Sequence, residues 1–295
     1  MANPGSDEIV RLAQQRIAER QNQEREQVQS ERQQQVRGST SWRWAFAGLI
    51  ATLLIALLLW PGTPLNWKMY AVVHGVCAQI HNVELGGVQL PLCARNTGIY
   101  AGFLNTLIFL AILGRGRAGK LPPIGVTIVL GLFVLIMAVD GFNSMLRDMF
   151  LPHLYVPFNA LRTMTGLGMG ISLGVMLLLI INLALRSDVQ RDQRVLNGWG
   201  ELAAAVGLNL LIWAAIYGNV GVFYWPIAIV AWTGIVGILF CVNLLVAAIV
   251  MQYENAVSNL RDLAKPGTVA LILTGIELGL LSWARFWLEG RGLIV

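Results

Sequence analysis

Charged side chains are scarce in this chain of 295 residues, and their scarcity excludes most soluble proteins. Only 13% of the residues are Asp, Glu, Lys or Arg, whereas 56% are hydrophobic; about a quarter of the residues of an ordinary soluble domain are charged. Six arginines and six acidic residues lie within residues 1–41, which leaves 15 basic and 10 acidic residues for the other 254. That number cannot cover a water-exposed surface. A soluble enzyme and a nucleic-acid-binding domain are therefore excluded, and no nucleic-acid partner is expected.

Cysteines and recognisable catalytic motifs are also rare. Three cysteines in 295 residues exclude a disulfide-rich scaffold. The sequence contains no metalloprotease helix motif and no glycine fingerprint for a dinucleotide. We therefore expect no cofactor and no metal, and the sequence leaves open whether the protein is an enzyme.

Long apolar stretches are abundant, and they predict a membrane protein. A transmembrane helix needs roughly 20 mostly apolar residues. No stretch alternates as a membrane β-strand does, so helices must cross the bilayer. The predicted fold is an all-α, polytopic bundle of about seven transmembrane helices. Their approximate ranges are 42–60, 97–113, 121–139, 165–185, 200–217, 226–250 and 268–288.

The distribution of Lys and Arg over the loops predicts the orientation, because basic residues of short loops stay on the cytoplasmic side. The N-terminal segment carries six arginines, and the loops 114–120, 186–198 and 251–267 each carry two or three basic residues. With seven spans, all four regions lie on one side. We therefore expect a multi-pass protein of a bacterial plasma membrane with a cytoplasmic N-terminus. The connections that then face outward are 61–96, 140–164 and 218–225.

The chain divides into three parts. Residues 1–41 are a cytoplasmic helical segment rich in Gln, Arg and Glu, residues 42–185 are a four-helix membrane module with polar outer loops, and residues 186–295 hold three further transmembrane helices. A helix that is polar on all sides is either solvated or lies against a partner. Residues 1–37 are therefore a candidate contact with other subunits of a membrane complex.

Four polar motifs lie on the outward connections and at the adjoining ends of the spans. They read Cys77-Ala-Gln, Pro91-Leu-Cys-Ala-Arg-Asn-Thr-Gly-Ile-Tyr100, Asp140-Gly-Phe-Asn143 and Asn159-Ala-Leu-Arg-Thr-Met-Thr-Gly166. Over residues 70–185 they resemble a family of bacterial integral membrane proteins known only as a domain of unknown function. The resemblance implies a four-helix membrane module and no particular activity.

Two residues depart from the family pattern. Ala78 stands where the family has a histidine, and Asn96 stands where it has the second cysteine of a Cys-x-x-Cys. These departures argue against a redox pair of that kind and against a cysteine-rich metal site.

Cys77 and Cys93 lie 16 positions apart on the expected outer, oxidising side of the membrane. A structural disulfide and two free thiols both stay open as interpretations. With His74 and His81 they would form a set of two cysteines and two histidines, but that spacing matches no standard zinc pattern.

Five polar residues at the outer ends of the spans are the candidate ligand-binding residues: Arg95, Asp140, Asn143, Asn159 and Arg162. Charges at the lipid boundary are costly unless they are paired or hydrated. One interpretation is that salt bridges and helix caps tie the helix ends together. The other is a polar pocket, in which Arg95 and Arg162 bind a phosphate or carboxylate and Asp140 positions them or acts as a base.

Glu277 lies near the middle of the last span. A carboxylate at this depth is a candidate for moving protons or cations. It is equally consistent with a protonated group that is hydrogen-bonded to Asn209 or Asn243, or with one that faces a partner subunit.

Glycines spaced four residues apart predict which spans touch. The second span carries Gly98 and Gly102, and the fourth carries Gly166, Gly170 and Gly174. Small residues at this spacing let two helices approach closely. We therefore expect the second and fourth spans to pack together and to gather the outer arginines at one opening.

Two functions follow from these residues. The first is the binding or handling of a small anionic or amphipathic molecule, such as a lipid headgroup, at the outward-facing polar pocket; transport and membrane-embedded catalysis are forms of it. The alternative is a structural or accessory subunit of a larger membrane complex, because the N-terminal helix is polar and no catalytic motif is present.

Overall fold

The computed structural model describes residues 6–36, 40–77 and 80–293. Outside these ranges lie parts of two predicted features, residues 1–5 and 37–39 of the cytoplasmic segment and the pair 78–79 that follows Cys77. The described chain is mostly helical. Its elements are α1 (Ser6–Val36), α2 (Thr40–Leu59), α3 (Leu65–Val73), η1 (His74–Val76), β1 (Asn82–Leu85), β2 (Val88–Cys93), α4 (Ala94–Ile112), β3 (Ala118–Lys120), α5 (Ile124–Asp148), α6 (Asn159–Leu185), β4 (Gln190–Arg194), α7 (Trp199–Tyr217), η2 (Gly221–Phe223), α8 (Tyr224–Val250), η3 (Leu260–Leu263) and α9 (Ala264–Gly290).

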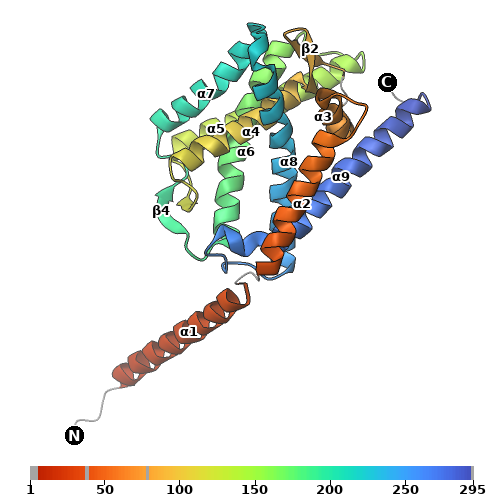
Figure 1. Cartoon of the computed structure of the whole chain (residues 1–295). Coiled ribbons are helices and arrows are strands. Elements are labelled where there is room, and N and C mark those ends of the chain that lie inside the picture. The colour runs from red at the N-terminus through yellow and green to blue at the C-terminus, as the bar shows by residue number, and fades with distance from the viewer. Residues whose placement is uncertain (1–5, 37–39, 78–79, 294–295) are drawn as a thin grey trace.

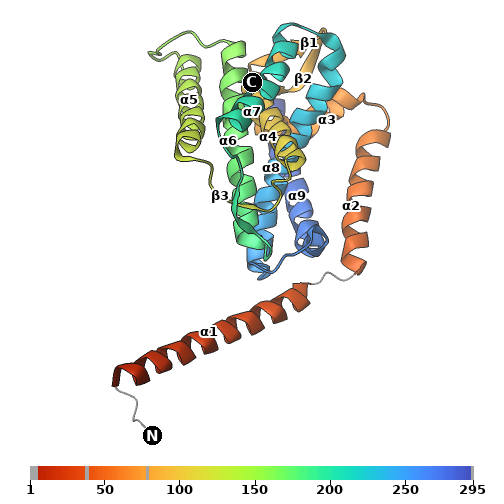
Figure 2. The same ribbon diagram turned by 90° about the vertical axis from the view of Figure 1, so that its left-hand side faces the viewer.

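Six helices in the described part of the chain are long and apolar enough to cross a membrane: α2, α5, α6, α7, α8 and α9. The predicted all-α, polytopic membrane bundle is thereby confirmed. The span predicted at residues 97–113 forms α4, which has 19 residues. α4 is not among these six helices because Arg95, Asn96 and Asn105 make it less apolar. α4 packs against α6 and α8 inside the bundle (Figure 2). The number of seven spans and the cytoplasmic N-terminus stay predictions.

Two small sheets mark the two ends of the bundle (Figure 1). β1 and β2 form an antiparallel hairpin, and we call the end of the bundle that carries it the hairpin end. β3 and β4 pair in parallel at the opposite end. The all-α prediction overlooked the hairpin, although Gly86 and Gly87 give a signal for it. Both have positive φ, +62° and +75°, and a Gly-Gly pair with this geometry forms a tight two-residue turn.

α4 and α6 lie in close contact, and glycines make this approach feasible. A Cβ on Gly98 would lie 2.3 Å from the Thr163 carbonyl oxygen, and a Cβ on Gly170 would lie 2.3 Å from that of Ile99. Any larger residue at these positions would force the helices apart. The predicted contact between these two spans is confirmed, and it places the first turns of α4 and α6 side by side at the hairpin end.

α1 and α2 are the most peripheral helices. α2 contains no buried residue and packs chiefly against α9. α1 extends away from the bundle, at the end opposite the hairpin, in both views (Figures 1 and 2). The predicted boundaries at residues 41 and 185 stay predictions.

Candidate ligand site at the hairpin end

The five candidate residues lie together at the hairpin end. Arg95 is in the first turn of α4, Asp140 and Asn143 are in the last turns of α5, and Asn159 and Arg162 are in the first turn of α6. The close packing of α4 on α6 brings the two arginines together, and α5 packs beside α6 and adds the acid.

Asp140 is the acceptor at the centre of this cluster, and only 1% of it is exposed. Its carboxylate accepts hydrogen bonds from Arg95 Nη2 and from the Tyr155 hydroxyl, both at 2.6 Å. Thr165 Oγ1 donates a third, at 3.3 Å. One acid therefore connects α4, α5, α6 and the loop that joins α5 to α6.

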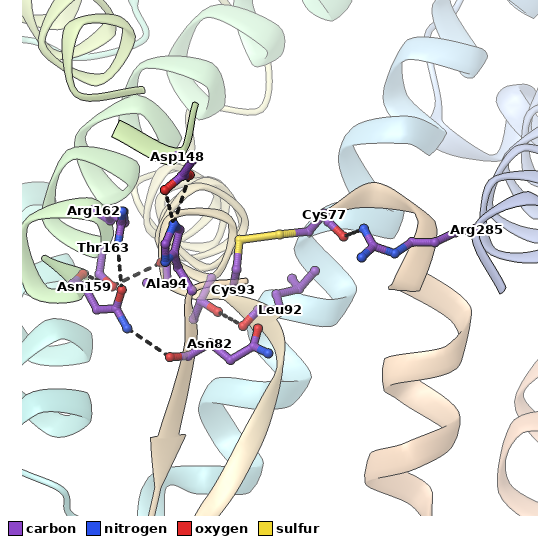
Figure 3. Close-up of a disulfide and its surroundings, with 12 residues drawn as sticks. Cys77, Asn82, Leu92, Cys93, Ala94, Asp148, Asn159, Arg162, Thr163 and Arg285 are labelled. Atoms are coloured by element: carbon purple, nitrogen blue, oxygen red, sulfur yellow. Dashed lines mark hydrogen bonds and ion pairs between the residues drawn. A yellow bond between two sulfur atoms is a disulfide. The ribbon is translucent and has the colours of Figure 1, made fainter. Parts of the chain in front are cut away.

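Arg162 is buried beside this acid, with 4% of its surface exposed. Its Nη1 donates to Asn159 Oδ1 at 3.0 Å (Figure 3), and its Nε donates to Ser144 Oγ at 3.4 Å. Arg95 Nη2 donates to the same Ser144 hydroxyl at 2.9 Å. The ion pair of Asp140 is with Arg95. In the described residues no carboxylate oxygen lies within 4.0 Å of the Arg162 guanidinium. The two arginines thus share the Ser144 hydroxyl, whereas the Asp140 carboxylate pairs with Arg95 alone.

Asn143 and Asn159 fasten the neighbouring loops. Asn143 Oδ1 accepts the Leu154 N–H at 2.7 Å, and its Nδ2 donates to the Tyr155 carbonyl at 3.0 Å. Asn159 Nδ2 donates to the Asn82 carbonyl in β1 at 2.9 Å (Figure 3). Both asparagines therefore hold backbone against the cluster.

Tyr155, Ser144 and Thr165 complete the cluster, and sequence reasoning missed their role. Burial, and next the hydrogen bond to Asp140, raise the pKa of Tyr155 to about 12. The sequence places Ser144 four residues and Tyr155 fifteen residues after Asp140. Four residues along a helix is the spacing of one face, which was the available signal for Ser144. The position of Tyr155 depends on how the loop folds back, and the sequence pattern does not specify that.

Two apolar cavities reach this polar cluster. One, of about 490 Å³, is lined by Asn143 together with hydrophobic residues of α5 and the following loop. The other, of about 190 Å³, lies between α5, α6 and α7 and includes Thr165 in its lining. The cluster thus has hydrophobic hollows beside a group of charged and polar side chains.

Cys77 and Cys93 are joined by a disulfide, with their Cα atoms 6.8 Å apart (Figure 3). His81 Nε2 lies 3.1 Å from Asp148, and His74 Nε2 lies 2.8 Å from Glu289. The two histidines therefore pair with carboxylates of α5 and α9. The described residues contain no group of three or more His, Cys, Asp or Glu that could hold a metal ion.

Glu277 lies on an exposed face of α9. Its Oε2 accepts a hydrogen bond from Asn243 Nδ2 at 2.9 Å. Asn209, the other partner considered from the sequence, instead accepts a hydrogen bond from Asn105 at 3.3 Å. Glu277 is thus connected to α8 and stands apart from the cluster at the hairpin end.

The fold defines a polytopic, α-helical membrane protein. Residues 77–176 match the family described as predicted membrane protein (DUF2085), a domain of unknown function. The resemblance to such a family is thereby confirmed for these residues, which include β1, β2, α4, α5 and the first part of α6. No curated protein and no solved structure matches the chain. Function must therefore be argued from the site.

Proposed function

We propose that this protein is a multi-pass protein of a bacterial plasma membrane that binds a small anionic or amphipathic molecule, such as a lipid headgroup, at its hairpin end. The ligand's anionic group would lie against Arg95 and Arg162. The observation that carries the proposal is the burial of Arg162, 4% exposed, without a carboxylate within 4.0 Å among the described residues.

The charge balance of the cluster favours an anion. Asp140 is the ion-pair partner of Arg95, and Asp148 is that of His81. Arg147 donates to the Pro157 carbonyl, which is a neutral acceptor. A buried cation without a counter-charge is costly, and a phosphate or carboxylate that accepts two N–H groups from a guanidinium offsets that cost.

The surroundings favour an amphipathic ligand in particular. The cavities of about 490 and 190 Å³ are lined almost entirely by hydrophobic residues, and each shares a residue with the polar network, Asn143 in one and Thr165 in the other. A molecule with an anionic head and an apolar tail would use both kinds of surface.

The orientation belongs to the proposal as well. We propose that the hairpin end faces outward, which the Cys77–Cys93 disulfide supports because disulfides persist in oxidising compartments. Arg115, Arg117 and Arg186 lie at the other end, where they pair with Glu201 and Asp188. Basic residues of this kind are typical of the cytoplasmic side.

The test is to extract the full chain from its native membrane in mild detergent and to measure its intact mass with bound species retained. We expect an anionic species on the wild type, much less of it on Arg162→Gln, and partial retention on Arg162→Lys. Arg291→Gln is the matched control, because Arg291 is exposed and stacks on Trp287 at the C-terminal end of α9, outside the cluster around Asp140. Equal occupancy of the wild type and Arg162→Gln would contradict the proposal.

A second candidate function is that of an accessory subunit in a larger membrane complex. The observation that favours it is the position of α1, a 31-residue polar helix that extends away from the bundle (Figure 1). Deleting residues 1–37 should then release chains that co-purify with the wild type, whereas Arg162→Gln should keep them. Purification of the wild type without any other chain would reject this candidate.

A further inference from the structure

A larger cavity lies at the end of the bundle opposite the hairpin, where the start of α2 meets α8, η3 and the start of α9. Its volume is about 770 Å³. Residues between Thr40 and Ala47 line one side, and Phe240, Leu244 and residues between Leu260 and Gly267 line the other. α8 and α9 extend from this cavity to the hairpin end (Figure 1), so the cavity is remote from the cluster around Asp140.

Most of the lining is hydrophobic. The rings of Phe46 and Phe240 lie with their centroids 6.2 Å apart across α2 and α8. A Cβ on Gly267 would lie 3.3 Å from the Phe46 ring, so this glycine lets the phenyl group approach the backbone of α9. The aromatic pair and Leu244 form a surface on which a hydrocarbon chain can pack.

Arg43 and Arg261 are the charged residues of this lining. In the described residues neither guanidinium has a carboxylate within 4.0 Å, and the Arg43 Nε is buried without a hydrogen-bond partner. Asp262, the acid next to Arg261 in sequence, has other hydrogen-bond partners. Asp262 Oδ2 accepts the Asn259 N–H at 3.0 Å as part of a capping box and lies 3.4 Å from Ser258 Oγ.

The neighbouring tryptophans indicate the depth of the arginines in the membrane. Trp42 and Trp44 flank Arg43 and both are exposed, and exposed indole rings at the end of a transmembrane helix lie at the level of the lipid headgroups. Arg43 therefore lies at the depth of a lipid phosphate, with hydrophobic lining towards the membrane interior.

We propose that this cavity binds one anionic glycerophospholipid. Its phosphate accepts hydrogen bonds from Arg43 and Arg261, and one acyl chain packs along Phe46, Phe240 and Leu244. Basic pockets between transmembrane helices are known to bind anionic headgroups. The proposal concerns a different end of the molecule from the proposed ligand site and does not depend on it.

The position of α2 gives this lipid a structural role. α2 has no buried residue, and the cavity lies between its first turns and the helices α8 and α9. A lipid in that space adds contacts on both sides and fixes α2 against the bundle. Binding should therefore raise the thermal stability of the protein by mass action.

The experiment uses the full chain, purified in neutral detergent and stripped of lipid, with phosphatidylglycerol or phosphatidylcholine of the same acyl chains added. Native mass spectrometry counts the bound lipid, and thermal unfolding measures its effect. We expect phosphatidylglycerol to bind and stabilise more than phosphatidylcholine, and the double variant Arg43→Gln, Arg261→Gln to weaken that binding about 30-fold. Inorganic phosphate should give little stabilisation, because it has no acyl chain.

Controls separate this site from general charge effects and from misfolding. The matched control is Arg191→Gln, Arg194→Gln, which removes two charges from β4 at the same end of the bundle and should bind like the wild type. Ala47→Trp keeps both arginines of the site and fills the cavity from an exposed position of α2; it should also lose the lipid. Equal binding of the two lipids, stabilisation by phosphate alone, equal losses in the two double variants, or full binding by Ala47→Trp would each overturn the proposal.

Discussion

Replacing Asp140 with asparagine tests how far the cluster at the hairpin end depends on one buried charge. Asp140 is 1% exposed and accepts hydrogen bonds from Arg95 and the Tyr155 hydroxyl, both at 2.6 Å. The variant keeps one oxygen that can accept from Arg95, and its amide nitrogen can donate to the Tyr155 hydroxyl, which reverses that hydrogen bond. It removes the negative charge that pairs with Arg95 and lies near Arg162. Removing one partner of a buried ion pair costs about 3–5 kcal/mol, and we expect the lower end of this range because both hydrogen bonds can persist.

The assay is unfolding of the purified protein in detergent, with Asp192→Asn as the control. Asp192 is an exposed acid of β4 at the other end of the bundle, so its replacement should change stability by less than about 0.5 kcal/mol. Adding Arg95→Gln to Asp140→Asn should restore part of the loss, because it removes one of the two uncompensated cations. If Asp140→Asn were no less stable than the control, the cluster would not depend on this charge and the argument would fail.

On the proposed function, the same variant should have the opposite effect on ligand binding. Asp140 would compete with a bound anion for Arg95, so its neutralisation should raise the affinity for that anion while it lowers the stability of the empty protein. A variant that loses both stability and the co-purifying species would indicate that Asp140 shapes the site and that its charge does not compete with the ligand.

Three further outcomes are expected. Gly98→Ala should destabilise the protein by about 1–3 kcal/mol, since its Cβ would lie 2.3 Å from a backbone oxygen of α6, whereas Gly131→Ala meets nothing within 4 Å and should be neutral or stabilising in the same unfolding assay. Serine at both Cys77 and Cys93 should lower the stability by about 3 kcal/mol, because the disulfide closes a loop with a sequence separation of 16 residues. Tyr155 has a pKa of about 12 in the folded chain and near 10 when unfolded, so its contribution to stability should be intact below pH 10 and lost as the pH rises to 12. In an ultraviolet titration, Tyr155→Phe should lose one tyrosine from the late part of the curve that the wild type shows.

Helix positions followed from the sequence, but their ends did not. The apolar run at 121–139 predicts the middle of α5, yet α5 continues to Asp148, and α6 begins at Asn159, six residues before the apolar run at 165–185. A hydropathy pattern detects only the apolar part of a helix. The helix itself can extend beyond that part where its polar side chains form hydrogen bonds or ion pairs. Asp140 and Arg162 lie in these polar extensions. Asp140 accepts a hydrogen bond from Arg95, and Arg162 donates one to Ser144.

The sequence predicted some of the residues of the candidate site, because polar side chains at the ends of the spans need partners. Charged and amide side chains near lipid need partners, so the five candidate residues could be grouped by their common end of the spans. Ser144, Thr165 and Tyr155 are compatible with many environments, and their hydrogen bonds depend on helix rotation and on the path of the loop between α5 and α6. Whether the five residues bind a ligand stays a prediction.

The packing of α2 also constrains the order in which this protein can be assembled. α2 emerges early in synthesis, while its main partner, α9, follows every other described helix. Throughout that interval α2 can contact lipid, α3 and, through the Phe46 and Phe240 rings, α8. Its sequence is rich in leucine, isoleucine and alanine, which are stable in contact with lipid. The bundle of α4 to α8 can form first, and the arrival of α9 then brings the first helix of the membrane part to its final position. A mutation on the face of α9 that contacts α2 should therefore impair a late step of membrane insertion and leave the core of the bundle intact.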